Sequence, residues 1–295
     1  MTSLEPTNLY IDAMATRFEV ALHGAERSRL RAAGEEAMRE ISSLERQLSM
    51  FRSDSDVAQI NRLAAQKPVK VETRLFRLLQ LCRQIYDVTA GAFDITVAPV
   101  MEAWRLAGVE CRLPSDDELA EARQRVGMRY VILDEENFTV YFSRDGIKID
   151  LGAIGKGYAI DRAVESLIES GIDSALIHGG TSTIYAIGTQ PDGEPWRIGI
   201  SDPVTHEAMR TIDLRDSSLS VSAPHGRLFI NNDRRYGHVL DPRTGEPTQT
   251  AALASVWGPQ GTLTDALSTA LLVLGDDGAR VIKQNYPEYE TAIKH

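Results

Sequence analysis

The sequence contains little cysteine and no long apolar run. Its two cysteines, Cys82 and Cys111, form no Cys-x-x-Cys pair and have no nearby histidine pattern, which excludes a structural zinc site. We expect two free thiols rather than a disulfide. No apolar run approaches the length of a membrane span, and residues 1–12 lack the apolar core of a signal peptide. The sequence as written therefore predicts no membrane segment and a cytoplasmic protein, or a periplasmic one if a leader has been removed.

Positive charge is also scarce. The chain has 32 lysines and arginines against 42 aspartates and glutamates, a formal net charge of -10. Binding to the phosphate backbone of nucleic acids needs a basic surface, so we expect no nucleic-acid partner. An acidic protein can still bind an anionic nucleotide, provided that a metal ion and local dipoles supply the positive field.

Internal repeats and Pro/Gly/Ser-rich linkers are absent as well. A chain of 295 residues buries a sizeable core. We therefore predict a single compact α+β domain over residues 14–295, made of two intimate subdomains without a linker, after a polar N-terminal extension over residues 1–13. Apolar spacing predicts helices over 30–48, 73–90, 115–127, 160–171 and 262–274, and strands over 17–22, 129–133, 138–142, 174–177, 197–200 and 210–214.

The stretch 148–161 combines charge with glycine. It is predicted to be a short strand that ends on Asp150 and then a bend with three glycines in six residues. A helix follows, whose apolar stripe runs from Ile160 to Ile168. Glycines let a ligand approach the backbone, and a helix N-terminus offers N–H groups to an anion, so the segment suits a phosphate-bearing ligand. It matches neither the Walker loop nor the dinucleotide fingerprint, and an ordinary strand-to-helix turn explains it equally well.

Asp265 and Thr269 are four residues apart on a predicted helix, so their side chains share one face. A carboxylate and a hydroxyl that leave room for water and phosphate are ligands that magnesium prefers. The alternative is an aspartate favoured by the helix dipole and a threonine bonded back to a carbonyl.

His238 is predicted on a strand that enters a tight turn, Asp241-Pro242-Arg243-Thr244-Gly245. Its ordinary pKa suits a general base near neutral pH, although a histidine there can also simply cap a sheet edge. His178 and His225 lie beside glycine turns and carry less information.

Several separated segments, in this order, resemble the motifs of the FAD:protein FMN transferase family, the ApbE-type flavin transferases. They are Met14-Ala15-Thr16-Arg17-Phe18, Leu48-Ser49-Met50-Phe51-Arg52, Gly91-Ala92-Phe93-Asp94, the run from Asp150 to Tyr158, Gly179-Gly180, the run from His238 to Gly245, and Thr264-Asp265-Ala266 with Thr269.

The resemblance implies a T-fold-type domain of mixed sheets with packed helices. It also implies an enzyme that, with magnesium, transfers FMN from FAD to a threonine or serine hydroxyl of an acceptor flavoprotein and releases AMP. Carried over by position, Asp265, Thr269 and the carbonyl of Ala153 would hold magnesium, and His238 would be the base. The residues implied to line the FAD pocket are Met14, Phe51, Ala92, Phe93, Asp94, Asp150, Lys156 and Leu240.

The sequence departs from the family pattern in places. Phe51 stands where tyrosine is usual, which keeps a stacking surface and loses a hydroxyl. The run Ser220-Val221-Ser222-Ala223-Pro224-His225-Gly226 replaces the usual Ser-Gly-Asp-Tyr stretch, on the side expected to face the acceptor. This change motivates one alternative function, an FAD pyrophosphatase that gives FMN and AMP. A non-catalytic flavin-binding protein is a further alternative.

Overall fold

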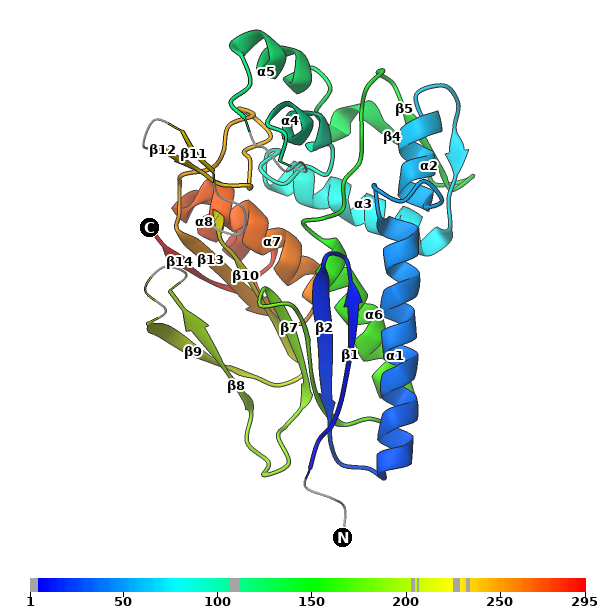
Figure 1. The fold of residues 1–295 in the computed structure, drawn as a ribbon, viewed down its shortest axis with the longest axis vertical. Coiled ribbons are helices and arrows are strands. Elements are labelled where there is room, and N and C mark those ends of the chain that lie inside the picture. The colour runs from blue at the N-terminus through cyan, green and yellow to red at the C-terminus, as the bar shows by residue number, and fades with distance from the viewer. Residues whose placement is uncertain (1–4, 107–111, 203–204, 206, 225–228, 232–233) are drawn as a thin grey trace.

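A seven-stranded antiparallel sheet forms the base of the fold (Figure 1). The computed structural model describes residues 5–106, 112–202, 205, 207–224, 229–231 and 234–295. In spatial order the strands are β1 (Thr7–Ala13), β2 (Thr16–Leu22), β6 (Ser174–Gly179), β7 (Thr183–Gly188), β10 (Ser217–Ser222), β13 (Leu253–Gly258) and β14 (Glu290–Lys294).

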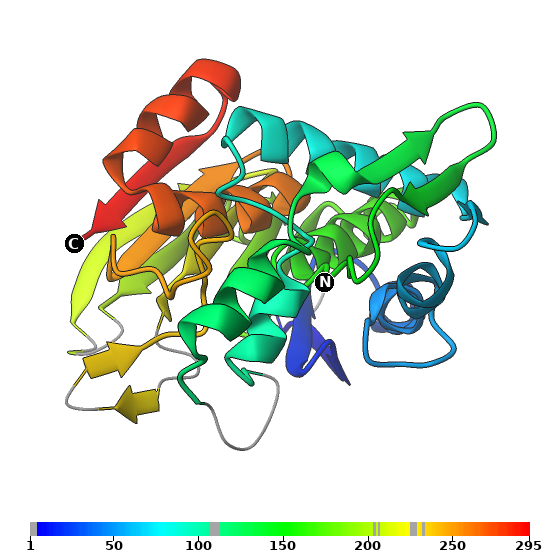
Figure 2. The ribbon, with the colours of Figure 1, turned by 90° about the horizontal axis from the view of Figure 1, so that it is seen from above.

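Helices cover one face of this sheet, and a β-ribbon covers the other. The helices are α1 (Arg27–Leu48), α6 (Gly155–Glu169) and α7 (Gly261–Leu274), and α8 (Asp276–Asn285) packs beside α7 (Figure 2). The main core lies between them and the sheet. On the opposite face, the ribbon of β8 (Trp196–Ser201) and β9 (Ala208–Leu214) closes a smaller core, in which Trp196 and Ile212 pack with Leu219 and Leu253 of the sheet.

A second layer of helices and small sheets lies above one end of the large sheet in Figure 1. It comprises α2 (Asp56–Leu63), α3 (Thr73–Val88), α4 (Ala98–Ala103), α5 (Asp116–Arg123), the 3₁₀ turn Met128–Tyr130, the small sheet of β3 (Val69–Lys70), β5 (Thr139–Phe142) and β4 (Val131–Asp134), and the hairpin of β11 (Phe229–Asn231) and β12 (Arg234–Tyr236). A hydrogen bond from Trp104 Nε1 to the Gly245 carbonyl, at 2.8 Å, joins this layer to the turn after His238. None of the described helices combines the length and the apolarity that a bilayer crossing requires.

The predicted α+β class and single domain are confirmed, as are the helices and strands that the apolar spacing indicated. The stripe of α1 is buried, because it faces the sheet: Leu30, Ala33, Ala37, Ile41, Leu44 and Leu48. Ser115 and Glu118 form the reciprocal capping hydrogen bonds that start α5. Cys82 is a free thiol whose pKa is raised by complete burial, whereas Cys111 and His225 lie outside the described residues.

Three features differ from the sequence-based expectations. Residues 7–13 are the edge strand β1, paired along its whole length with β2, so the boundary predicted at residue 14 falls inside a hairpin. Ile168, predicted on the core stripe of α6, is 53% exposed, because the helix turns that position away from the sheet near its end. Residues 148–150 form no strand.

The segment before α6 is held by a side chain instead of a neighbouring strand. Asn61 of α2 donates to the Ile149 carbonyl at 2.9 Å and accepts from the Ile149 amide at 2.7 Å. The amide of Asp150 then donates to the Ile95 carbonyl at 2.7 Å. These contacts supply the backbone N–H and C=O groups with the hydrogen bonds that a neighbouring strand would provide. The segment can therefore be extended without belonging to a sheet.

Helices α6 and α7 pack unusually closely at Gly157. A Cβ on Gly157 would lie 2.0 Å from the Gly261 carbonyl oxygen and 2.8 Å from Cβ of Asp265. Asp161, one turn further along α6, accepts hydrogen bonds from the amides of Gly261 and Thr262 at 2.7 and 2.8 Å, and so caps α7 from outside. Burial raises the pKa of Asp161.

We expect Gly157→Ala to destabilise the protein by at least about 2 kcal/mol, since the methyl group meets backbone atoms that cannot turn aside. This exceeds the roughly 0.5–1 kcal/mol that alanine normally gains over glycine in a helix. Urea unfolding would measure the effect. Gly155→Ala is the matched control, because a Cβ there meets nothing within 4 Å; equal stabilities of the two variants would contradict the close packing.

Candidate active site

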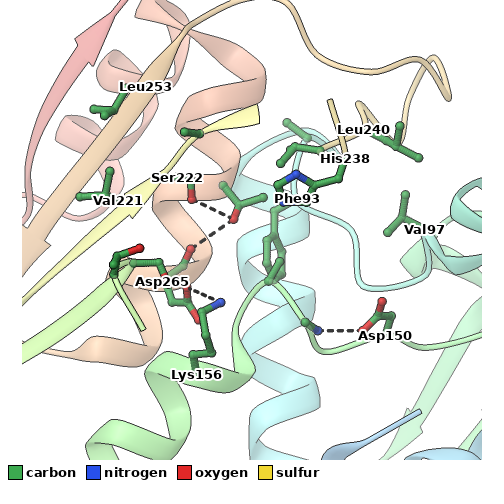
Figure 3. Close-up of a pocket in the computed structure, with 18 of the residues that line it drawn as sticks. Phe93, Val97, Asp150, Lys156, Val221, Ser222, His238, Leu240, Leu253 and Asp265 are labelled. Atoms are coloured by element: carbon green, nitrogen blue, oxygen red, sulfur yellow. Dashed lines mark hydrogen bonds and ion pairs between the residues drawn. The ribbon is translucent and has the colours of Figure 1, made fainter. Parts of the chain in front are cut away.

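A cavity of about 880 Å³ opens where the second layer meets the end of the large sheet (Figure 3). Its walls come from the loop between α3 and α4, the segment before α6, the ends of β8 and β10, the turn after β12, and α7. The lining includes the predicted residues Ala92, Phe93, Asp94, Asp150, Ala153, Lys156, His238, Leu240, Asp265 and Thr269. Their assigned roles stay predictions.

Two predicted residues do not line the cavity. Phe51 lies after α1 and is 75% exposed. Met14 occupies the β1–β2 turn with a φ of 51°, and its amide donates to Glu45 Oε1 at 2.7 Å. The structure therefore does not place Met14 and Phe51 among the residues that line the cavity.

Asp265 is a buried carboxylate of the cavity that is held by several contacts. It is 4% exposed, and its Oδ2 accepts a hydrogen bond from the Gly157 amide at 3.0 Å. Its Oδ1 accepts one from Thr183 Oγ1 at 3.3 Å and lies 3.7 Å from Lys156 Nζ. Figure 3 shows Lys156 reaching across from α6 to this carboxylate. The carboxylate is thus oriented by an amide and a hydroxyl, and its charge is partly balanced by an ammonium group.

The hydrogen bond to Gly157 also frees a carbonyl. In a continuous helix the Gly157 amide would donate to the Ala153 carbonyl, four residues earlier. It donates to Asp265 instead, and no other described residue donates to the Ala153 oxygen. This carbonyl therefore borders the cavity with an unused acceptor.

Behind Asp265 lies a chain of fully buried hydroxyl groups. Thr183 accepts from Ser220 at 3.3 Å, and Thr264 lies 2.9 Å from both Ser220 and Ser218. A hydroxyl can donate one hydrogen bond and accept another, so these groups are hydrogen-bonded to one another without water. This chain of hydroxyls was not predicted from the sequence, although serine at alternate positions 218, 220 and 222 of one strand places all three on one face.

The oxygen atoms near Asp265 fit a magnesium ion in chemical type. Asp265 offers a carboxylate, Thr269 a hydroxyl and Ala153 the unused carbonyl. Thr269 Oγ1 lies 3.4 Å from the Asp265 carbonyl and 3.4 Å from Ser222 Oγ, so it makes only long contacts. Nowhere in the described part of the chain do three His, Cys, Asp or Glu side chains gather as a metal group. A site here would accordingly use mixed oxygen ligands, as magnesium does when phosphate and water complete its shell.

His238 faces the same cavity beside Phe93 (Figure 3). It lies in a bend after β12, so its prediction on a strand is wrong: the chain leaves the β11–β12 hairpin at Tyr236. Its Nδ1 is 3.3 Å from the Pro224 carbonyl, which can accept a hydrogen bond but cannot donate one. This contact favours the neutral tautomer that carries its proton on Nδ1, in which Nε2 is the basic nitrogen.

Asp94 is the buried carboxyl of the α3–α4 loop, and burial raises its pKa to about 6. The Thr96 amide and hydroxyl donate to its Oδ1 at 2.8 and 2.6 Å and partly offset this effect. Burial likewise raises the pKa of Asp150, whose Oδ1 accepts from the Gly152 amide at 2.8 Å. Both carboxyls are thus more readily protonated than usual.

We expect Asp94 to make the protein less stable as the pH rises. The folded state holds this proton more tightly than the unfolded state, so stability from this group is highest below about pH 4 and falls until the pH passes the folded-state pKa. Between roughly pH 4.5 and roughly pH 7.5 the loss is about 2 kcal/mol. Asp94→Asn keeps the acceptor for Thr96 and should remove this part of the pH dependence in urea unfolding. Asp213→Asn, an exposed control on β9, should leave it unchanged.

Comparison with known proteins gives a consistent result. The family model described as ApbE family matches residues 14–293. The chain is 31% identical to a protein of Treponema pallidum named FAD:protein FMN transferase, over 87% of this chain and 75% of that protein, and 31% identical to a protein of the same name from Haemophilus influenzae, over 79% and 69%.

Solved structures match over nearly the whole chain. The ApbE protein of Thermotoga maritima has a TM-score of 0.90 at 28% identity and covers 98% of this chain and 94% of its own. The flavinyl transferase ApbE of Pseudomonas stutzeri, in its apo form, has a TM-score of 0.85 at 26% identity and covers 100% and 96%.

Proposed function

The chain belongs to the ApbE family, and we propose that it uses magnesium to transfer FMN from FAD to a threonine or serine hydroxyl of an acceptor flavoprotein, with release of AMP. One observation carries the proposal: a single cavity contains the oxygen set of Asp265, Thr269 and Ala153, the ammonium group of Lys156, and the imidazole of His238. Dinucleotide binding, pyrophosphate cleavage and proton removal each need one of these groups.

The dinucleotide would bind along the cavity floor. Phe93 and Leu240 supply apolar surface for a ring system, and the buried carboxyl of Asp94 and the half-buried carboxyl of Asp150 supply hydrogen-bonding groups. Lys156 stands in the first turn of α6, where its charge and the helix N-terminus favour a pyrophosphate.

Asp265, Thr269 and the Ala153 carbonyl would hold the metal. Magnesium, when bound, neutralises charge on the pyrophosphate oxygens. The protein holds Asp265 in place from behind, through the Gly157 amide and the Thr183 hydroxyl, so the carboxylate need not reorient during the reaction.

His238 would act on the acceptor. Nε2 removes the proton from the incoming hydroxyl, whose oxygen then bonds to the phosphorus atom of the FMN half. The bond from that phosphorus to the bridging oxygen breaks, and the oxygen leaves on AMP. The Pro224 carbonyl keeps the ring in the required tautomer while it receives the proton.

The test combines the protein with FAD, magnesium and candidate flavoproteins that carry an accessible threonine or serine. The expected result is a covalent flavin band by in-gel fluorescence, together with AMP by chromatography. Free FMN and AMP without a labelled protein would instead identify a pyrophosphatase, and intact FAD would identify a binding protein. One observation favours the pyrophosphatase. Ser222 begins the altered Ser222–Gly226 run and contacts Thr269, so the altered run reaches the proposed metal site.

A further inference from the structure

A second pocket, of about 550 Å³, lies directly behind the wall of the cavity. It shares Asp94 and Pro242 with the cavity and is bounded by the end of α3, the end of α5 and the turn after His238. Among the described residues its lining contains four arginines, Arg123, Arg129, Arg144 and Arg243, and one carboxylate, that of Asp94. We call it the arginine pocket.

Three of these arginines are held by neutral groups rather than by carboxylates. Arg123 donates to the Arg243 carbonyl at 2.8 Å, and Arg144 donates to the Gln124 carbonyl at 2.6 Å. Arg129 donates to the hydroxyl of Tyr130 at 3.1 Å. The guanidinium groups of Arg129 and Arg144 both stack on the Tyr130 ring, at 4.5 and 4.2 Å from its centroid.

These contacts fix the side chains without neutralising them. In the described part of the chain, Arg123, Arg129 and Arg144 form no ion pair with a carboxylate, whereas Arg243 pairs with Asp241 at 2.7 Å. Stacking and carbonyl contacts leave most of each guanidinium's N–H groups available. The pocket therefore concentrates positive charge on a protein whose net charge is -10.

The ligand such a pocket suits is a group of carboxylates on a macromolecule. Guanidinium groups bind carboxylates in pairs of parallel hydrogen bonds. The arginines are exposed rather than enclosed, so they suit a surface that docks from outside better than a small anion that must be surrounded. Arg243 also lies in the turn that follows His238, which places the pocket beside the group that would meet an acceptor.

We propose that the arginine pocket docks an acidic segment of the acceptor flavoprotein, rich in aspartate or glutamate, while the acceptor hydroxyl enters the neighbouring cavity. This inference rests on the proposed function, because it takes the second substrate to be a protein. Charge complementarity of this kind raises the rate of encounter and selects among partners.

The experiment measures binding of a fluorescein-labelled hexaglutamate peptide by anisotropy. The double variant Arg129→Gln/Arg144→Gln should weaken binding by about tenfold, in keeping with about two lost charge-assisted contacts at an exposed site. It should raise the KM for an acceptor flavoprotein while leaving the Kd for FAD unchanged. The control Arg31→Gln/Arg39→Gln removes the same charge from the exposed face of α1 and should leave peptide binding near the wild-type value.

Equal loss of binding in both double variants would show a general charge effect and overturn the proposal. It would also be overturned if inorganic phosphate or AMP bound in an Arg129-dependent way while the peptide did not. Because peptide binding needs no turnover, absence of FMN transfer alongside Arg129-dependent peptide binding would count against the proposed function and not against the arginine pocket.

Discussion

Asp265→Asn is expected to lower magnesium-dependent FMN release from FAD by on the order of 10²–10³. The asparagine has the same shape and can still accept the Gly157 amide hydrogen bond, so the fold should persist. It loses the negative charge that would hold the metal and that Lys156 faces at 3.7 Å. Initial rates over a magnesium titration would measure the effect, and the variant should require far more magnesium for half-maximal rate.

Asp277→Asn is the control for this measurement. Asp277 is likewise an aspartate near the start of a helix, α8, but its side chain is 69% exposed and is not part of the lining of the cavity. Wild-type rates and magnesium dependence in Asp265→Asn would remove Asp265 from the metal site. Asp265→Ala should be inactive as well, with additional destabilisation because the Gly157 amide and the Thr183 hydroxyl lose their acceptor.

His238→Ala is expected to reduce transfer to the acceptor by about 10²–10⁴, the usual contribution of a general base, while the Kd for FAD changes by less than about threefold. The difference arises because the imidazole would act on the acceptor's proton and not on the dinucleotide. Single-turnover transfer and fluorescence titration with FAD would separate the two quantities. Added imidazole should restore part of the rate.

The control here is His295→Ala, which replaces an exposed histidine that does not line the cavity. A normal transfer rate in His238→Ala would rule out its role as the base. A parallel loss of FAD affinity and rate would assign the residue to binding instead. Gly237→Ala offers a second approach: a Cβ there would lie 2.7 Å from the Pro224 carbonyl oxygen, so it should displace the ring and lower the rate without removing the imidazole.

The sequence predicted best those features that depend on local periodicity. The helix α7 places Asp265 and Thr269 on one face as their spacing requires, and both line the cavity. The capping box of α5 is equally local. Asp94 was identified only because its motif resembles that of a family. His238 was also noted as a possible base from its place before a tight turn, but only the resemblance joined it to residues of distant segments.

The features that were missed depend on contacts between distant segments. The strand expected at residues 148–150 does not form, since Asn61 provides the hydrogen bonds that a neighbouring strand would have provided. Gly157 was identified as part of a bend, but its use as a contact point for Gly261 depends on how α6 meets α7. Likewise, the edge strand β1 has an alternating pattern too polar to stand out until β2 is beside it.

The clamp between Asn61 and Ile149 couples the cavity to a helix that does not line it. Opening of α2 would release the backbone just before Asp150, so any ligand that needs this backbone in place also favours the closed state of α2. Saturating FAD should therefore slow hydrogen exchange of the α2 amides, although the helix makes no contact with the cavity. Asn61→Ala should abolish that protection. Binding in the cavity would then no longer stabilise α2, which belongs to the second layer.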